Sequence, residues 1–199
     1  IVQELKNSGF CCGNFQQIHF SILEVSVEHC SQIHAKFAET GGQNSVFVHI
    51  GVDSKAKSVK LEQCAYNNMT FRVPDVCGYQ PQDLKICSES TLDCPIYTEL
   101  PLSKICEDLN VTYPDGSIST GGDDDAADKV SLVQLSQDPG RYLCNYTYYQ
   151  ALQHQKSAGR PIYALFVHVP PFDVIPQERQ VALVRSLLER IASFVCDQY

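Results

Sequence analysis

Segments with strand patterning and segments with helix patterning alternate along this chain of 199 residues. The strand-like segments are short, apolar and β-branched, and the helix-like segments carry apolar residues at intervals of three and four. We expect strands at 18–25, 45–52, 59–66, 130–135 and 162–168. We expect helices at 1–8, 27–40, 102–109, 144–153 and 176–196. This order predicts an α/β fold, a three-layer α/β/α sandwich with a mostly parallel (mixed) central sheet covered on both faces.

The helix patterns also carry end signals and a packing face. Gly41 and Gly42 follow the helix at 27–40 and are suited to its C-cap. The last helix has one apolar face that we expect to pack on the sheet, formed by Val181, Val184, Leu188, Ile191 and Val195. Residues 67–96 are rich in turn-forming residues, which predicts irregular structure there.

The length of the chain fits one well-buried domain, residues 1–199, and is short for two. The net charge is −8 and no basic stripe stands out, so we expect no nucleic-acid partner. No apolar run reaches membrane-spanning length and no signal peptide is recognisable, so we expect no membrane partner. The first six residues have the pattern of the middle of an amphipathic helix, which leads us to expect a missing upstream segment.

Residues 113–128 combine turn residues with an acidic run, Asp123, Asp124 and Asp125. This composition predicts a loop whose carboxylates are solvated. The order of the acidic residues does not match an EF-hand loop, so a calcium site is the less favoured alternative. We expect neither a metal nor a cofactor in this protein.

The ten cysteines allow two interpretations. A secreted protein would pair them in disulfides, whereas an intracellular protein would keep them reduced as small buried hydrophobes. The reduced state is favoured because the chain is long enough to build a core without crosslinks and no zinc-like Cys-x-x-Cys pair occurs. Glycosylation sequons at Asn68, Asn110 and Asn145 point the other way, although such short patterns often arise by chance.

Cys144 has the sequence surroundings of a nucleophile. The strand expected at 130–135 is followed by a turn at 136–140, and Cys144 stands at the start of the next helix. At a helix N-terminus, unpaired N–H groups and the macrodipole favour the thiolate, which is the reactive form of cysteine. The layout is similar to the strand–turn–helix elbow of α/β hydrolytic enzymes. Taken alone, such a cysteine is more often a packed core residue.

Two further residues supply the groups that a cysteine nucleophile needs. His168 ends the apolar strand at 162–168, just before Pro170 and Pro171 stop strand pairing. Strand ends are where α/β folds place their sites, so His168 is the candidate base. Glu62 is a charged residue in a strand-like stretch and is the candidate that orients the imidazole. On composition alone, Glu62 would be a surface glutamate and His168 a structural histidine.

The segments around these residues resemble one enzyme family. Residues 136–149, Ser-Gln-Asp-Pro-Gly-Arg-Tyr-Leu-Cys-Asn-Tyr-Thr-Tyr-Tyr, resemble the cysteine signature of the pyroglutamyl-peptidase I family (pyrrolidone-carboxylate peptidases, cysteine peptidase family C15). Residues 166–170, Phe-Val-His-Val-Pro, are similar to its histidine motif. Glu62 falls where the family carries its catalytic glutamate, and Gly51 marks the preceding strand end. Residues 71–81 are similar to the segment that follows that glutamate.

The resemblance spans nearly the whole chain and implies a role for each of these residues. It implies that Cys144 is the nucleophile, that His168 is the general base and acid, and that Glu62 orients His168. It further implies that Arg72 takes part in stabilising the oxyanion and that Val73 and Leu143 lie near the substrate ring. From the resemblance we also expect that the family's first strand and substrate loop are missing from this sequence and that 113–128 is an insertion.

The resemblance implies a cytosolic cysteine omega-peptidase. It would remove an N-terminal pyroglutamyl residue from peptides through a thioester acyl-enzyme. One alternative is a catalytically silent homologue that keeps the fold and binds a peptide or a protein. Another is a disulfide-rich secreted binding module, which would require most cysteines to be paired.

Overall fold

The computed structural model describes residues 1–12, 15–40, 44–114, 131–159 and 161–198. Its helices are Val2–Asn7 (α1), Val27–Thr40 (α2), Leu102–Thr112 (α3), Leu143–Ser157 (α4) and Gln177–Cys196 (α5). Its strands are Ser45–Val52 (β1), Val59–Glu62 (β2), Cys64–Tyr66 (β3), Pro95–Tyr97 (β4), Val133–Ser136 (β5) and Ile162–Val169 (β6). Strands and helices therefore alternate through the second half of the chain, as the sequence predicts.

The central sheet is mixed and mostly parallel, with the strand order β1-β6-β2-β5. β1 runs parallel to β6 over eight residue pairs, from Ser45–Ile162 to Val52–Val169. β2 runs parallel to β5 and antiparallel to β6, which joins the two parallel pairs into one sheet. β3 and β4 form a separate antiparallel pair.

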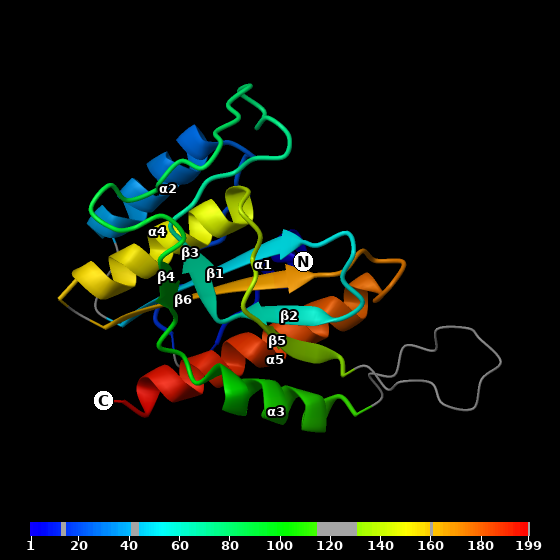
Figure 1. Cartoon of the computed structure of the whole chain (residues 1–199). Helices are drawn as coiled ribbons and strands as arrows, with labels where there is room; N and C mark the ends of the chain where they lie inside the picture. Colours follow the sequence, from blue (N-terminus) through cyan, green and yellow to red (C-terminus); the bar gives the residue numbers. More distant parts are fainter. Residues whose placement is uncertain (13–14, 41–43, 115–130, 160, 199) are drawn as a thin grey trace.

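The helices cover both faces of this sheet, which confirms the three-layer α/β/α fold. Figure 1 shows α2 and α4 on one side of the strands and α3 and α5 on the other. The buried strand β6 has alternating side chains, so it packs against both layers. Tyr163, Leu165 and Val167 join the cluster with α3 and α5, whereas Ala164 and Phe166 join the cluster with α4. We call these two sides the α5 face and the α4 face.

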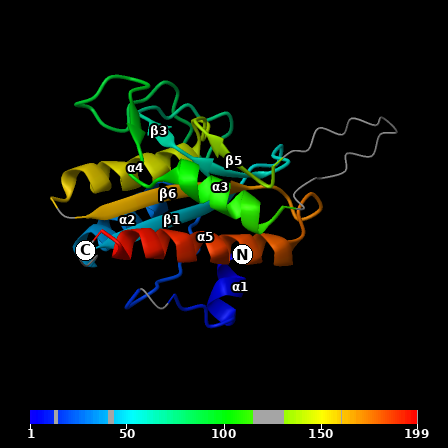
Figure 2. The ribbon, with the colours of Figure 1, turned by 90° about the horizontal axis from the view of Figure 1, so that it is seen from below.

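The last helix corrects one sequence prediction about its packing face. Ile191 and Val195 pack on the α5 face of the sheet as expected, together with Leu183 and Leu187. The other three expected residues, Val181, Val184 and Leu188, belong instead to a cluster with Leu5 and Phe10. The helix is buried along two stripes because α1 and the chain that follows it lie against its outer side, as Figure 2 shows.

The strand expected at 18–25 is absent, and these residues have no regular secondary structure. Ile18 and Phe20 pack beside α5, whereas Ile22 is 71% exposed. One backbone bond ties the end of this segment to the loop at 71–82, since Val76 N donates to Val25 O. The alternating pattern therefore matches the packing at Ile18 and Phe20 but not at Ile22, and the described residues offer this segment no strand partner.

Other expected elements differ in length or position. The strand expected at 59–66 divides at Gln63, and its second part pairs with β4 in the smaller sheet. The strand expected at 130–135 is observed at Val133–Ser136, and the helices expected at 102–109 and 144–153 are longer than predicted. β1 has the expected bounds but lies at an edge of the sheet, so it is half-buried rather than buried. Gly41, Gly42 and most of the loop expected at 113–128 fall outside the described residues.

Within the described part of the chain, no helix is long and apolar enough to cross a membrane.

Candidate active site

The candidate base and its orienting carboxylate meet on the α4 face of the central sheet. His168 pairs in register with Gly51 of β1 on one side and with Lys60 of β2 on the other. Glu62 lies two residues beyond Lys60 on the same strand, so both side chains are on one face of the sheet. The sheet itself therefore brings His168 and Glu62 together, although 106 residues separate them in sequence.

His168 and Glu62 form a buried hydrogen-bonded pair. Nδ1 of His168 lies 2.8 Å from Oε1 of Glu62, and the two residues are 7% and 0% exposed. Burial by itself would lower the pKa of His168, but hydrogen bonds to Cys144 and Glu62 and their negative charges outweigh it. The net effect raises the pKa of His168 to about 9, so the imidazole holds a proton readily.

Cys144 reaches this pair from the start of α4. It is the second residue of the helix and is half-buried. The first backbone bond across the helix start runs from Tyr146 N to Tyr142 O, which leaves the N–H groups of Leu143, Cys144 and Asn145 without helical acceptors. Tyr142 supplies no capping side chain, so the positive end of the helix is open at the sulfur.

The turn before Cys144 has the elbow shape that the sequence suggests. β5 ends at Ser136, and α4 begins at Leu143. Gly140 lies between them with φ of +77°, a left-handed conformation that favours glycine. Gly140 N donates to Oδ1 of Asp138, which closes the turn. The chain thus leaves the sheet and enters the helix within six residues, with Cys144 at the exit.

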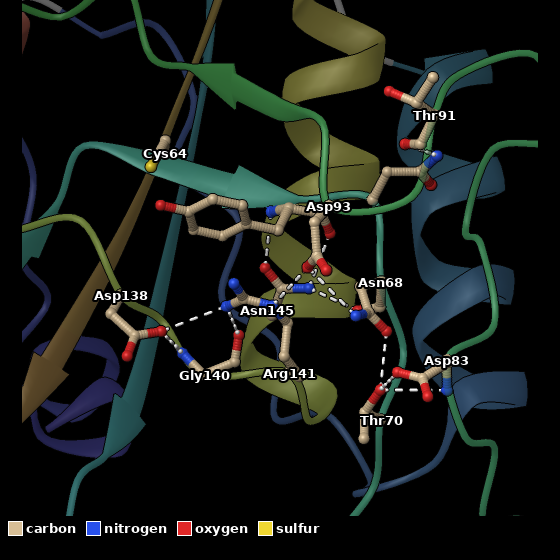
Figure 3. A network of polar contacts seen from close by, with 12 residues as sticks. Cys64, Asn68, Thr70, Asp83, Thr91, Asp93, Asp138, Gly140, Arg141 and Asn145 are labelled. Carbon is tan, nitrogen blue, oxygen red and sulfur yellow. Dashed lines mark hydrogen bonds and ion pairs between the residues drawn. The ribbon is translucent and has the colours of Figure 1, made fainter.

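Asn145, directly after Cys144, locks this helix start to β3 (Figure 3). Its side chain accepts a bond from Tyr66 N at 2.8 Å and donates to Tyr66 O and Asn68 O, each at 2.9 Å. Asn145 is fully buried, and these bonds satisfy both ends of its amide. Sequence reasoning considered Asn145 only as a sequon. Its place just inside a helix start, where an amide side chain readily reaches a neighbouring backbone, is the signal that could have indicated this role.

Arg141 fixes the same turn from the outside. Its Nε donates to Asp93 at 3.0 Å and its Nη1 donates to Asp138 at 3.2 Å, as Figure 3 shows. Its guanidinium also lies 3.9 Å from the centre of the Tyr66 ring. The two ion pairs are partly exposed, so the stacking and the geometry of the fork matter more than the charges alone.

Close packing sets the distance between Cys144 and β1. A Cβ at Gly51 would lie 2.8 Å from Cζ of Phe166 and 3.3 Å from Sγ of Cys144. The sulfur therefore lies beside the backbone of Gly51, which is the register partner of His168. Tyr148, one helical turn beyond Cys144, donates its hydroxyl to Glu62 O at 2.8 Å. The helix that carries the sulfur is thus tied to the strand that carries the carboxylate.

The three other expected site residues lie in different surroundings. Arg72 and Val73 are exposed in the loop after Phe71, and Val73 is 58% exposed. Leu143 is buried in an apolar cluster with Phe71, at the start of α4. The rings of Phe71 and Tyr142 lie 4.6 Å apart, so this loop is held close to the elbow.

Asp75 holds that loop in place. Its Oδ1 accepts bonds from the backbone N–H groups of Cys77 and Tyr79, and its Oδ2 accepts one from Val27 at the start of α2. Tyr142 adds a hydroxyl bond to Pro74 O at 3.2 Å. Arg72 and Val73 therefore project from a loop that is anchored to both α2 and the elbow.

The sequon asparagines make structural hydrogen bonds in this fold, and none of the ten cysteines forms a disulfide. The side-chain nitrogens of Asn68, Asn110 and Asn145 are each hydrogen-bonded, to Asp93, Val133 O and two backbone carbonyls respectively. Among the described residues, no group of three or more His, Cys, Asp or Glu side chains is arranged to hold a metal.

Comparison with known proteins relates the chain to one family. A family model described as pyroglutamyl peptidase matches residues 129–187, the segment that carries Cys144 and His168. Pyroglutamyl-peptidase 1 of Homo sapiens is 29% identical over 170 residues, which cover 85% of this chain and 69% of that protein. Pyrrolidone-carboxylate peptidase of Thermococcus litoralis is 28% identical over 153 residues, which cover 77% of this chain and 60% of that protein.

Solved structures share the fold. The structure of pyrrolidone carboxyl peptidase from Thermococcus litoralis superposes with a TM-score of 0.76 at 20% identity, covering 99% of this chain and 87% of that one. The enzyme from Fervidobacterium islandicum gives a TM-score of 0.74 at 22% identity, covering 96% of this chain and 88% of that one. The family model and the sequence relatives thus show that this chain is similar to pyroglutamyl peptidases (Peptidase C15), and the solved structures show that it shares their fold.

Proposed function

We propose that this protein is a cysteine peptidase that removes an N-terminal pyroglutamyl residue from peptides. The observation that carries the proposal is the convergence of Cys144, His168 and Glu62 on the α4 face, with the sulfur at an open helix N-terminus. A nucleophile, a base and an orienting carboxylate in this order form the arrangement that acyl transfer by a thiol requires. The substrate class comes from the names of the relatives.

The first half of the reaction forms a thioester. His168 takes the proton of the Cys144 thiol, and the sulfur attacks the carbonyl carbon of the pyroglutamyl residue. The tetrahedral intermediate collapses when the carbon–nitrogen bond breaks, and the imidazolium gives its proton to the leaving amine of the peptide. Glu62 accepts a hydrogen bond from Nδ1–H of His168, which directs Nε2 toward the sulfur and stabilises the imidazolium.

The second half releases free pyroglutamate. His168 takes a proton from a water molecule, and the hydroxide attacks the thioester carbon. The carbon–sulfur bond then breaks, and the sulfur leaves as thiolate or takes the proton back from His168. In each tetrahedral intermediate the negative oxygen needs hydrogen-bond donors. The free N–H of Cys144 at the helix start is one donor, and we propose Arg72 as a second.

We propose that Val73 and Leu143 provide apolar contacts for the pyroglutamyl ring. The ring is small, uncharged and carries an amide, which suits an apolar surface with a few backbone hydrogen bonds. The anchoring of the Arg72–Val73 loop to the elbow supports this proposal, because it keeps the loop near Cys144.

Hydrolysis of a pyroglutamyl-fluorophore amide by the wild type and by Cys144→Ser tests the proposal. We expect the substitution to reduce kcat/KM by at least roughly a thousandfold, because a serine hydroxyl at this position does not ionise as a thiol does and is a much weaker nucleophile. The melting temperature should stay close to that of the wild type, since sulfur and oxygen differ little in volume. Comparable rates for both proteins would rule out Cys144 as the nucleophile. Binding of a pyroglutamyl peptide without turnover by the wild type would instead favour a silent homologue.

We also propose that the protein works in the cytosol. The need for a free Cys144 thiol and the engagement of all three sequon asparagines support this location. Titration of thiols in denatured protein, after lysis with an alkylating agent under non-reducing conditions, tests it. We expect most of the ten cysteines to be free. Finding only one or two free thiols would overturn the proposal.

A further inference from the structure

An ion pair lies directly beside the candidate base, on the same face of the sheet. Nζ of Lys60 lies 2.8 Å from Oδ2 of Asp53. Lys60 is the register partner of His168 on β2, and Asp53 follows the last residue of β1. Asp53 N donates to Val169 O at 3.0 Å, so Asp53 extends the hydrogen bonding between β1 and β6 by one residue past Val52, two residues beyond Gly51, the register partner of His168. The pair therefore spans β6 at the level of the imidazole.

The pair is held in place but remains open to solvent. Oδ1 of Asp53 accepts a bond from Lys55 N, which fixes the carboxylate in the turn after β1. The side chains of Lys60 and Asp53 are 32% and 27% exposed. Partly exposed ion pairs of this kind add little to stability, so stability alone does not account for charges at this position.

Lys60 and Asp53 have opposite effects on the protonation of His168. Four charged or titratable side chains lie around the imidazole: Lys60 and Glu62 of β2, Cys144 of α4, and Asp53 after β1. On the same face, His49 of β1 and Tyr148 of α4 pack against Phe166, and Cys30 of α2 interacts electrostatically with Cys144. Lys60 is the one lysine or arginine in this set. Because its backbone lies opposite His168, its charge opposes protonation of the imidazole, while the carboxylate of Asp53 favours it.

We infer that the Asp53–Lys60 ion pair balances its two charges against His168, so that Lys60 does not displace the proton that the imidazole must hold. Asp53 is then a positioning residue that acts through electrostatics, and neither partner touches the reacting atoms. Burial opposes ionisation of Asp53, but bonds from Lys60 and from Lys55 N, with the charges of Lys60 and His168, lower its pKa. The carboxylate therefore stays charged wherever His168 titrates.

The inference predicts shifts of opposite sign for the two single substitutions. Asp53→Asn keeps the acceptor for Lys55 N but leaves Lys60 uncompensated, so the pH at which His168 loses its proton should fall by roughly half a unit. Lys60→Met leaves Asp53 alone beside the imidazole, so that pH should rise by a similar amount. In Asp53→Asn/Lys60→Met the two effects should cancel. High salt, about 1 M, should shrink both single shifts.

The measurement is a pH titration of the His168 ring by NMR, paired with the pH dependence of Cys144 alkylation by iodoacetamide, followed by mass spectrometry of the Cys144 peptide. Matched controls are Glu189→Gln on α5 and Lys104→Gln on α3, which change the net charge equally on exposed positions of the opposite layer. We expect no shift in either control. A melting curve confirms that each variant is folded.

Three outcomes would each overturn the inference. Both single variants could shift in the same direction, the double variant could fail to return to the wild-type value, or the controls could shift by the same amount. The role of His168 as a catalytic base comes from the proposed function, and the two ideas fail separately. Opposite shifts in a protein that does not hydrolyse pyroglutamyl amides would support the electrostatic inference and refute the proposed function. Normal hydrolysis of pyroglutamyl amides without the opposite shifts would support the proposed function and refute the electrostatic inference.

Discussion

The two faces of the central sheet carry different kinds of residue, although they are built from the same strands. On the α5 face, Leu165 and Val167 of β6 meet Leu61 of β2 and the helices α3 and α5 in an apolar cluster. On the α4 face, the neighbouring positions of the same strands are His168 and Glu62. One residue along a strand therefore separates a position that stabilises the fold from one that carries chemistry.

The α4 face also contains a buried polar atom that destabilises the fold. Glu62 is fully buried, and its Oε2 has no hydrogen-bond partner among the described residues. An unpartnered buried oxygen destabilises a folded protein, and such groups are expected where function requires them. The α4 face retains that cost beside His168, while the side chains of β6 on the α5 face are apolar.

The largest effect should come from removing the imidazole on the α4 face. We expect His168→Gln to lower kcat/KM for a pyroglutamyl amide by roughly a thousandfold or more, because no other side chain in the site accepts the thiol proton. Steady-state kinetics across pH 5–10 would measure this. Retention of more than about a tenth of the activity would show that the face does not depend on His168.

Leu165→Ala should have the reverse signature on the α5 face. Leu165 is fully buried in the apolar cluster, so its truncation should lower the free energy of unfolding by about 3 kcal/mol. Activity per folded molecule should change little. Denaturant unfolding and kinetics at low temperature measure the two quantities, and Val111→Ala, at a position 79% exposed, is the control. A large loss of kcat without loss of stability would contradict the idea that the α5 face serves stability and the α4 face serves catalysis.

Glu62→Gln tests the electrostatic half of the buried pair while keeping its shape. Glu62 is one cause of the raised pKa of His168, so its neutral amide should move the alkaline limb of the pH–rate profile to lower pH. We expect kcat/KM near neutral pH to fall by about a hundredfold. An unchanged profile would mean that Glu62 acts only as a packing residue. Glu62→Gln leaves the pairing of His168 with Gly51 of β1 unchanged.

The smallest effect concerns two half-buried histidines on the α4 side of the sheet, His34 of α2 and His49 of β1. The rings of His34 and His49 lie 5.3 Å apart. Burial, with the nearby charge of His154, lowers the pKa of His34 to about 4, and burial with the charge of His34 lowers that of His49 to about 3. The unfolded chain binds these protons near pH 6.5, before the folded protein does. Stability should therefore fall as the pH drops from 6.5 toward 4.

His49→Leu should flatten this acid dependence. The substitution removes one of the two groups that titrate only after unfolding, so the loss of stability between pH 6.5 and 4 should shrink by about 1 kcal/mol or more. Denaturant unfolding at several pH values would measure it, with exposed His19→Leu as the control. A slope equal to that of the wild type would mean that His49 is protonated in the folded protein.

The sequence by itself determined the kinds and order of the main elements. The fully apolar run at Ile162–Val169 and the periodic helix at Gln177–Cys196 appear where their patterns predict them, because such long patterns have one stable packing solution. The sequence also indicated Cys144 as a helix-start residue and His168 as a strand-end residue, since turn residues and prolines mark those ends locally.

Tertiary structure alone decided how those residues meet. The antiparallel pairing of β2 with β6 places Lys60 and Glu62 beside His168, and strand pairing over this distance in sequence leaves no local signal. The extended segment at 18–25 failed to become a strand because strand formation depends on a partner rather than on its own alternation. The bonds of Asn145 to Tyr66 likewise depend on where α4 lies against β3, which only the folded chain defines.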